Sequence, residues 1–287
     1  MSRLALLVIL LLPLAACSLD MSRTSVDDVG ARRNASIPLD HLPALAGDYL
    51  PITSTHSGRT YHVYVRLPEG YDPQEARRYP VVYLLDGDSL FPLLAPTHLL
   101  LTYDEDLPEA ILVGIVYGGF DPSVNKRDMD FSAPAPDAAA GEGGAPAFLQ
   151  FLARELIPEV EKRYRADASR RVLLGQSRGG TFVLWSALEA PDLFWGRIAS
   201  NPTLLPGRER FFIDAAPHAR GDLQVAVASG SRDTERRQRN AVEWTQAWSG
   251  RSDAPWQVAL LPIEGGTHAA SIGEAYRQAM LWLFRDE

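Results

Sequence analysis

The chain has 287 residues, 46% of them hydrophobic, with a formal net charge of −8 at pH 7 and one cysteine. Nucleic acid is not an expected partner, because phosphate contacts need a basic face. One cysteine allows no internal disulfide, so the hydrophobic core must hold the fold unaided. A chain of this length buries enough surface to do so as one domain.

The N-terminal segment is similar to a bacterial lipoprotein signal. Residues 4–12 form an apolar run that is too short to span a membrane. Leu14-Ala15-Ala16-Cys17 follows and resembles a lipobox, with cleavage before Cys17 and lipid on its thiol. An ordinary secretory signal is the alternative. Ser18 in the next position resembles an outer-membrane sorting signal, which predicts a lipid-anchored protein that faces the periplasm.

Three parts of the chain follow from this pattern. We expect a signal peptide over residues 1–16 and a lipidated cysteine with a polar tether over residues 17–44. A single α/β domain is expected over residues 45–287.

The rest of the chain alternates strand-like and helix-like segments, which predicts an α/β fold with a mostly parallel central sheet and helices on both faces. Residues 61–67 alternate aromatic and β-branched side chains and predict an antiparallel edge strand. Continuous apolar runs at 80–85 and 110–116 predict buried parallel strands. Further strands are expected at 171–174, 196–200, 223–228 and 256–261.

Helical spacing is strongest over residues 148–165, where Pro158 predicts a kink. Other helices are expected at 181–188, 240–248 and 271–284. Residues 133–144 are rich in Ala, Pro and Gly and predict a loop without packed structure. This loop follows the strand that ends near Val116, so we expect it on the carboxyl side of the sheet, where ligands bind. It is either a flap over the site or a plain surface loop.

The motif with most chemical content is Gly175-Gln176-Ser177-Arg178-Gly179, between an expected strand and an expected helix. This setting predicts the nucleophile elbow of an α/β-hydrolase. The turn is so tight that the residues flanking the serine must lack large side chains, and Gly180 allows the helix to approach the sheet. Ser177 is therefore the candidate nucleophile.

A serine nucleophile needs a neighbouring base, and in α/β-hydrolases the order is serine, acid, histidine. His268 lies on a glycine-containing loop after the last expected strand. Asp233 follows the strand that ends near Ala228 and would orient His268. Glu235 is an alternative acid, a dyad without an acid is left open, and Asp233 would also suit a helix cap.

Ester chemistry also needs donors for the developing oxyanion. The backbone N–H of Arg178, next to the nucleophile, is one candidate. The second is the N–H of Asp88, because Gly87 permits an unusual turn that directs this amide inward. The Asp88 carboxylate is expected to have no part in this, and an ordinary Asp-Gly turn is the alternative. The sequence lacks the spacing of a metal or nucleotide site, so neither metal nor cofactor is expected.

Together these segments resemble the esterase D-like branch of the α/β-hydrolases, which includes siderophore (enterobactin) esterases. The resemblance runs over nearly all of residues 47–285. The matching segments are Tyr83–Gly87, Val113–Ile115, Arg127–Phe131, Gly175–Gly180, Pro191–Phe194, Ala199–Pro202 and Gly265–His268.

The resemblance implies the same nucleophile, base and oxyanion donors as the residues themselves. It also implies that Arg127 and Asp128 lie near the site. Arg127 would be either a ligand-binding cation or the structural partner of Asp128.

We therefore expect a serine hydrolase of small-molecule carboxylic esters, with a catecholate siderophore ester as the most specific substrate. Arg127, Arg178 and the region of Trp185 and Trp195 would offer cationic and aromatic contacts to such a ligand. The alternative for each is a structural role, since tryptophans usually fill cores. The alternatives are esters of acylated sugars, short acyl esters, an acyltransferase reaction, or a non-catalytic envelope lipoprotein. The sequence leaves the substrate and the oligomeric state open.

Overall fold

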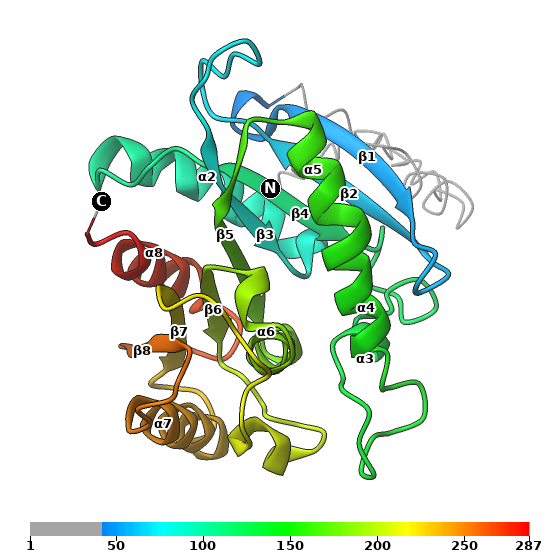
Figure 1. The fold of residues 1–287 in the computed structure, drawn as a ribbon, viewed down its shortest axis with the longest axis vertical. Helices are drawn as coiled ribbons and strands as arrows, with labels where there is room; N and C mark the ends of the chain where they lie inside the picture. The colour runs from blue at the N-terminus through cyan, green and yellow to red at the C-terminus, as the bar shows by residue number, and fades with distance from the viewer. Residues whose placement is uncertain (1–41, 287) are drawn as a thin grey trace, which may run out of the picture. The chain divides into compact units, whose positions relative to one another are not determined.

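The structure is a computed structural model that describes residues 42–286. The expected signal peptide, Cys17 and most of the expected tether lie outside the described residues. The described residues form one compact unit, in which a single sheet is covered by helices on both faces (Figure 1). The expected α/β fold is confirmed.

The sheet has eight strands in the order β1-β2-β4-β3-β5-β6-β7-β8. The first two strands are antiparallel to their neighbours, and the remaining strands are parallel. The carboxyl ends of the parallel strands therefore meet at one edge of the sheet. The strands are β1 (Gly47–Thr53), β2 (Thr60–Arg66), β3 (Tyr79–Leu84), β4 (Ile111–Val116), β5 (Ala166–Gln176), β6 (Gly196–Ser200), β7 (Leu223–Gly230) and β8 (Trp256–Ile263).

The expectation of an edge strand over residues 61–67 is wrong in one respect. The strand there, β2, is antiparallel as predicted, but it lies between β1 and β4. The edge is β1, where Leu50 is the single buried residue. A strand with so few buried side chains shows no apolar alternation, which is why the sequence did not reveal it.

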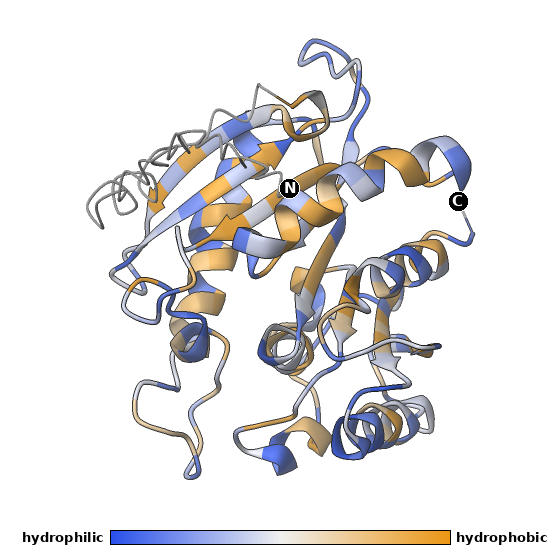
Figure 2. Ribbon diagram, turned by 180° about the vertical axis from the view of Figure 1, so that it is seen from behind, coloured by the Kyte–Doolittle hydropathy of each residue, from blue (hydrophilic) through white to orange (hydrophobic). Residues whose placement is uncertain are grey.

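The helices lie in two layers, with α2 and α8 on one face of the sheet and α4 to α7 on the other (Figure 1). Figure 2 shows apolar residues along the central strands and mixed polar and apolar residues along the helices. None of the helices within residues 42–286 is long and apolar enough to cross a membrane. The helices are α2 (Gly87–Asp104), α3 (Arg127–Asp130), α4 (Ala145–Phe151), α5 (Ile157–Arg163), α6 (Arg178–Glu189), α7 (Glu235–Ser249) and α8 (Ile272–Leu283).

The kink expected near Pro158 takes the form of a π-helical turn, Leu152–Leu156, between α4 and α5. Pro158 stands in the first turn of α5. A proline has no N–H to donate to the carbonyl four residues earlier, and the wider turn removes the need for that bond. The sequence did not predict α2, because Pro92 and Pro96 interrupt its pattern.

A buried histidine in α2 should make the fold acid-sensitive. The His98 ring lies 2.8 Å from the Tyr276 hydroxyl and 3.1 Å from the Pro108 carbonyl. Burial lowers the pKa of His98 from 6.5 to about 4, against the opposing hydrogen bond to Pro108. A histidine whose folded pKa is depressed contributes stability that is present above its unfolded value and is lost as pH falls through the folded value.

We therefore expect the free energy of unfolding to decrease between pH 6.5 and 4, with about 3 kcal/mol of that decrease due to His98. The measurement is urea unfolding across this pH range for the wild type and His98→Gln. The variant should show a shallower pH dependence, whatever its stability at neutral pH. An unchanged slope would contradict this role for His98.

Candidate active site

The nucleophile elbow joins β5 to α6. Ser177 has φ 56° and ψ −116°, a strained conformation for a residue with a side chain. Its N–H donates to the Ser200 carbonyl at 2.8 Å, so the strained residue is tied to the neighbouring strand. A Cβ on Gly175 would lie 2.4 Å from the carbonyl of Gly179, and one on Gly180 would lie 2.8 Å from the Ser200 oxygen. These close approaches explain why Gly175 and Gly180 lack side chains.

Hydrogen bonds join the three residues that the sequence predicted as catalytic, from Ser177 to His268 and from His268 to Asp233. His268 Nε2 is 3.0 Å from Ser177 Oγ, and His268 Nδ1 is 2.7 Å from Asp233 Oδ2. With the proton on Nδ1, the imidazole donates to Asp233 and accepts the serine hydroxyl. This is the arrangement in which a histidine removes the proton of a serine.

Asp233 is held as an anion. Its Oδ1 accepts the Thr234 N–H at 2.6 Å and an Arg237 N–H at 3.2 Å. Burial opposes ionisation, yet the hydrogen bonds from His268 and Thr234 outweigh it and hold the pKa of Asp233 below its usual value. The alternative acid, Glu235, is exposed and pairs with Arg239 at 3.2 Å. The acid beside His268 is therefore Asp233.

Asn201 supports the histidine loop, a contact that the sequence did not predict. Its Nδ2 donates to the His268 carbonyl at 2.9 Å and to Ser271 Oγ at 2.9 Å, while its Oδ1 accepts the Gly230 N–H at 2.8 Å. Asn201 has φ 46°, a left-handed conformation that asparagine tolerates well. It thus connects the ends of β6 and β7 to the loop of His268.

Replacing Asn201 with aspartate should remove the hydrogen bonds that this residue donates and keep the one that it accepts. The introduced carboxylate would keep an acceptor for Gly230 but would lose the N–H donors to His268 and Ser271. We expect a loss of about 2 kcal/mol in the free energy of unfolding and about a tenfold lower kcat for ester hydrolysis. Urea unfolding and steady-state kinetics check the two effects, and a wild-type kcat in this variant would contradict the supporting role.

The turn that carries the second expected oxyanion donor differs from the prediction in its left-handed residue. The left-handed residue is Asp86, with φ 53°, and not Gly87. Gly87 is needed for space, because a Cβ there would lie 2.8 Å from the backbone of Ile115. The Asp88 carboxylate is also engaged, since it accepts the N–H groups of Tyr117 at 2.9 Å and Gly118 at 3.0 Å.

Burial raises the pKa of Asp88, although hydrogen bonds from backbone amides, those of Tyr117 and Gly118 among them, act in the opposite direction. The carboxylate thus ties the start of α2 to the segment that follows β4. The Asp88 amide is in the first turn of α2, and the Arg178 amide is in the first turn of α6. Both amides follow the carboxyl ends of neighbouring parallel strands, β3 and β5.

A cavity of about 250 Å³ opens at this edge. Its walls include the serine, the histidine and the turn that carries Asp88, with the exposed ring of Phe120 on one side. The residues that line it are Asp86, Asp88, Ser89, Leu90, Phe120, Asn125, Arg127, Gln176, Ser177, His268 and Ala269. The cavity is large enough for part of a small-molecule ester.

A family model described as "Putative esterase" matches residues 54–279, which is most of the chain. The chain belongs to this esterase family. Among curated proteins it is 32% identical over 169 residues to the ferri-bacillibactin esterase BesA of Bacillus subtilis. It is 31% identical over 160 residues to the apo-salmochelin esterase of Escherichia coli O6:H1. These matches cover 53% of this chain and 57% and 49% of the two relatives, so the chain spans about half the length of the curated relatives it matches.

Solved structures show the same fold. The siderophore hydrolase EstB from Aspergillus nidulans matches with a TM-score of 0.71 and 21% identity, over 88% of this chain and 97% of that chain. The enterobactin and salmochelin hydrolase IroE matches with a TM-score of 0.64 and 24% identity, over 83% and 94%. The α/β-hydrolase architecture expected from the sequence is thereby confirmed.

The expectation that the region of Trp185 and Trp195 contacts a ligand is wrong. Trp185 and Trp195 are 4% and 3% exposed and pack in the core, against Phe182 and Phe284. Tryptophans usually fill cores, and the exposed aromatic ring at the cavity is that of Phe120, which is 75% exposed.

The two arginines expected at the site are both paired. The Arg178 side chain forms an ion pair with Glu142 and lies 3.1 Å from Asp128. The guanidinium of Arg127 faces Asp86, and Asp128 is more distant at 3.7 Å. Asp86 was not predicted as a site residue, because only the fold brings it beside Arg127.

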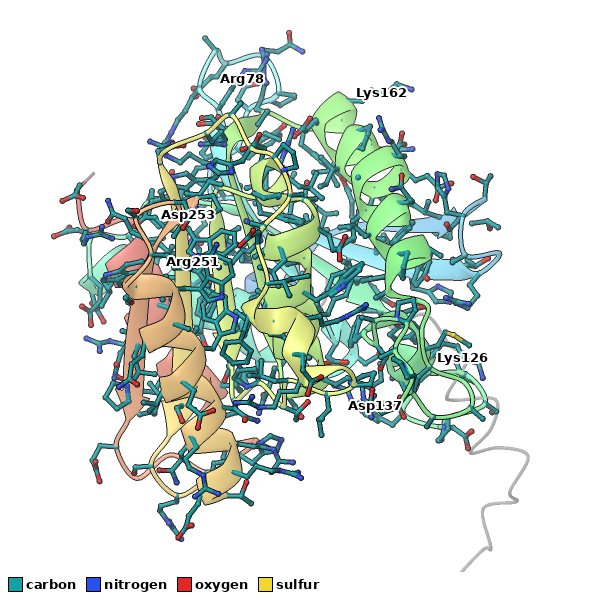
Figure 3. The ribbon with its side chains drawn as sticks, turned by 60° about the horizontal axis from the view of Figure 1, so that its bottom comes forward. Arg78, Lys126, Asp137, Lys162, Arg251 and Asp253 are labelled. Atoms are coloured by element: carbon teal, nitrogen blue, oxygen red, sulfur yellow. The ribbon has the colours of Figure 1, made fainter. Side chains whose placement is uncertain are left out.

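The loop over residues 133–144 lies at the site end of the molecule and contains neither helix nor strand, as expected. Asp137 within it accepts the Gly207 N–H at 2.9 Å, and Glu142 pairs with Arg178. Figure 3 shows Asp137 at the opposite end from Arg78, which directly precedes β3. The loop is thus attached beside the nucleophile elbow. Among residues 42–286, no group of three or more His, Cys, Asp or Glu side chains is arranged to hold a metal.

Proposed function

We propose that this chain is a serine esterase that hydrolyses small-molecule carboxylic esters with Ser177, His268 and Asp233. The main support for the proposal is the continuous chain of hydrogen bonds from Ser177 Oγ through the His268 imidazole to the Asp233 carboxylate. Membership of the esterase family supports it.

The chemistry has two halves. Ser177 Oγ attacks the ester carbonyl carbon while its proton passes to His268 Nε2, and Asp233 stabilises the imidazolium. The amides of Arg178 and Asp88 would hold the oxyanion. Collapse of the tetrahedral intermediate breaks the bond to the alcohol oxygen, which takes the proton from Nε2. Water then gives a proton to Nε2 and attacks the acyl-enzyme, and the acid leaves as Ser177 recovers its proton.

For the substrate we propose a catecholate siderophore ester. The support is similarity to proteins named as ferri-bacillibactin and apo-salmochelin esterases. An exposed aromatic ring, Phe120, beside the cavity suits an aromatic ligand. Esters of acylated sugars and short acyl esters are the competing substrates.

Covalent labelling tests the nucleophile first. A fluorophosphonate should modify the purified full-length protein at Ser177, as located by mass spectrometry of the peptides. Ser89 lines the same cavity, so Ser89→Ala is the matched control and should still be labelled, whereas Ser177→Ala should not. Labelling that survives Ser177→Ala would overturn the proposal.

Substrate preference is tested by offering ferric enterobactin and p-nitrophenyl butyrate to the wild type and Ser177→Ala. Much faster Ser177-dependent cleavage of the siderophore supports the proposed substrate. Cleavage of the butyrate alone would retain the esterase and reject the siderophore. Transfer of the acyl group to an added alcohol in preference to water would indicate an acyltransferase.

We further propose that lipid on Cys17 anchors the protein in the cell envelope, facing the periplasm. The support is the order of Leu14, Ala15, Ala16 and Cys17 after an apolar run. Cells fed with radioactive palmitate should label the wild type but not Cys17→Ser. Equal labelling of both proteins would contradict the anchor.

A further inference from the structure

The strongest polar contact at the cavity that the mechanism does not use joins Arg127 to Asp86. Arg127 Nε is 2.7 Å from Asp86 Oδ1, and Arg127 Nη2 is 3.0 Å from Asp86 Oδ2. Two parallel N–H···O bonds of this kind fix direction as well as distance. The Asp86 side chain is 15% exposed, so solvent screens the pair only partly.

Asp86 occupies a position between the two candidate oxyanion donors. It is the left-handed residue directly before Gly87 and Asp88, and its carbonyl accepts the N–H groups of Ser89 and Leu90, each at 3.0 Å. Its carboxylate also faces the elbow, since a Cβ on Gly179 would lie 3.2 Å from Asp86 Oδ2. Any displacement of Asp86 would therefore move the start of α2 relative to the elbow.

The neighbour of Arg127 reaches the other donor segment. Asp128 Oδ1 is 3.1 Å from Arg178 Nε, so Arg127 and Asp128 contact the segments of both donors. The Asp128 side chain is 66% exposed, and an exposed ion pair contributes little. Of these two contacts, the one between Asp86 and Arg127 therefore contributes more to holding the donor segments.

The short helix α3 that holds both residues is fixed at its far end. Asp130 is completely buried, and it accepts the hydroxyl groups of Tyr61 at 2.8 Å and Tyr117 at 3.0 Å and pairs with Arg59. The N–H of Tyr117 is also bound by the Asp88 carboxylate at 2.9 Å. Both ends of α3 are therefore connected to the segment that carries the Asp88 amide.

We propose that Arg127 is a positioning residue, which holds the Asp86 turn and thereby sets the Asp88 amide at a fixed distance from the Arg178 amide. This inference rests on the proposed esterase function. The Arg127 guanidinium acts on the reaction through Asp86, so its effect on the rate does not depend on the charge of the substrate. A substrate-binding cation, by contrast, would discriminate between anionic and neutral esters.

Two esters separate these roles, neutral p-nitrophenyl butyrate and the anionic mono-p-nitrophenyl ester of succinic acid. Arg127→Gln should lower kcat about 10- to 100-fold on both, with KM changed by less than about threefold, because a displaced oxyanion donor affects the transition state. Asp86→Asn should show the same pattern. The double variant should be no worse than either single variant, since both remove one contact.

Several outcomes would overturn the inference. One is a KM that rises for the anionic ester alone, with kcat retained on the neutral ester, which would make Arg127 a substrate-binding cation. Another is a double variant whose loss is the product of the two single losses. A third is a wild-type kcat in Asp86→Asn.

Controls separate positioning from general damage and from failure of the proposed function. Arg220 and Asp222 form a matched bidentate pair with distances of 2.8 and 2.7 Å, just before β7 and hence at the opposite edge of the sheet. Arg220→Gln should retain wild-type kcat.

Asparagine tolerates the left-handed conformation of the Asp86 turn, so Asp86→Asn should fold even where Arg127→Gln does not. A wild type without Ser177-dependent hydrolysis would reject the function itself, whereas an active wild type with unaffected variants would reject only the positioning role.

Discussion

Replacing Asp233 with asparagine should lower kcat by about 10³- to 10⁴-fold without unfolding the protein. The Asp233 carboxylate accepts the proton of His268 Nδ1 at 2.7 Å and so leaves Nε2 free to accept from Ser177. An asparagine that donates its amide to Nδ1 would favour the opposite tautomer, in which Nε2 carries the proton and cannot act as a base. It would also remove the negative charge that stabilises the imidazolium.

Steady-state kinetics on a p-nitrophenyl ester, with far-UV circular dichroism for folding, measure this effect. Glu235 is two residues away and pairs with Arg239 on the surface, so Glu235→Gln is the matched control and should retain wild-type kcat. If Asp233→Asn kept more than about a tenth of the activity, His268 would act without an acid, and the dyad would replace the triad.

Gly175→Ala should remove activity through the backbone, without touching a catalytic side chain. The added Cβ would lie 2.4 Å from the carbonyl carbon and oxygen of Gly179, and backbone atoms cannot rotate away as a side chain can. The elbow must therefore shift. We expect a loss of about 1–3 kcal/mol in the free energy of unfolding and at least about a 100-fold lower kcat.

Urea unfolding and kinetics would again report the two quantities. Gly273 lies in α8 with nothing within 4 Å of an added Cβ, so Gly273→Ala is the control and should leave activity unchanged. It should also stabilise the fold by a few tenths to about 1 kcal/mol, because alanine favours a helix more than glycine. A fully active Gly175→Ala would show that the elbow tolerates the shift.

Much of the fold could be predicted from the sequence, and so could the three residues that hydrogen bonds join at the site. Ser177, Asp233 and His268 each follow an apolar run that forms all or the last part of a strand, so the run marks where the loop emerges. Because the strands are parallel, loops that are far apart in the chain meet at one edge. A serine, an acid and a histidine that each follow one of these strands are therefore expected to lie close together.

The contacts that support these residues were not predictable in this way. Asn201 reaches His268 across 67 positions of the chain, and Arg127 reaches Asp86 across 41, with no repeating pattern to connect them. The expected role of Gly87 was assigned to the wrong residue, because aspartate also tolerates the left-handed conformation and Asp86 adopts it. Edge strand β1 and helix α2 were missed because little of the first is buried and two prolines interrupt the second.

The hydrogen bond from the Ser177 amide to Ser200 makes the nucleophile an extension of the sheet itself. Phe120 and Asn125 also line the cavity, and they belong to the segment between β4 and α3. The reacting serine and this part of the cavity lining are therefore carried by different segments of the chain. Substitution of the exposed Phe120 ring can therefore change the lining of the cavity while the sheet continues to hold Ser177 in place.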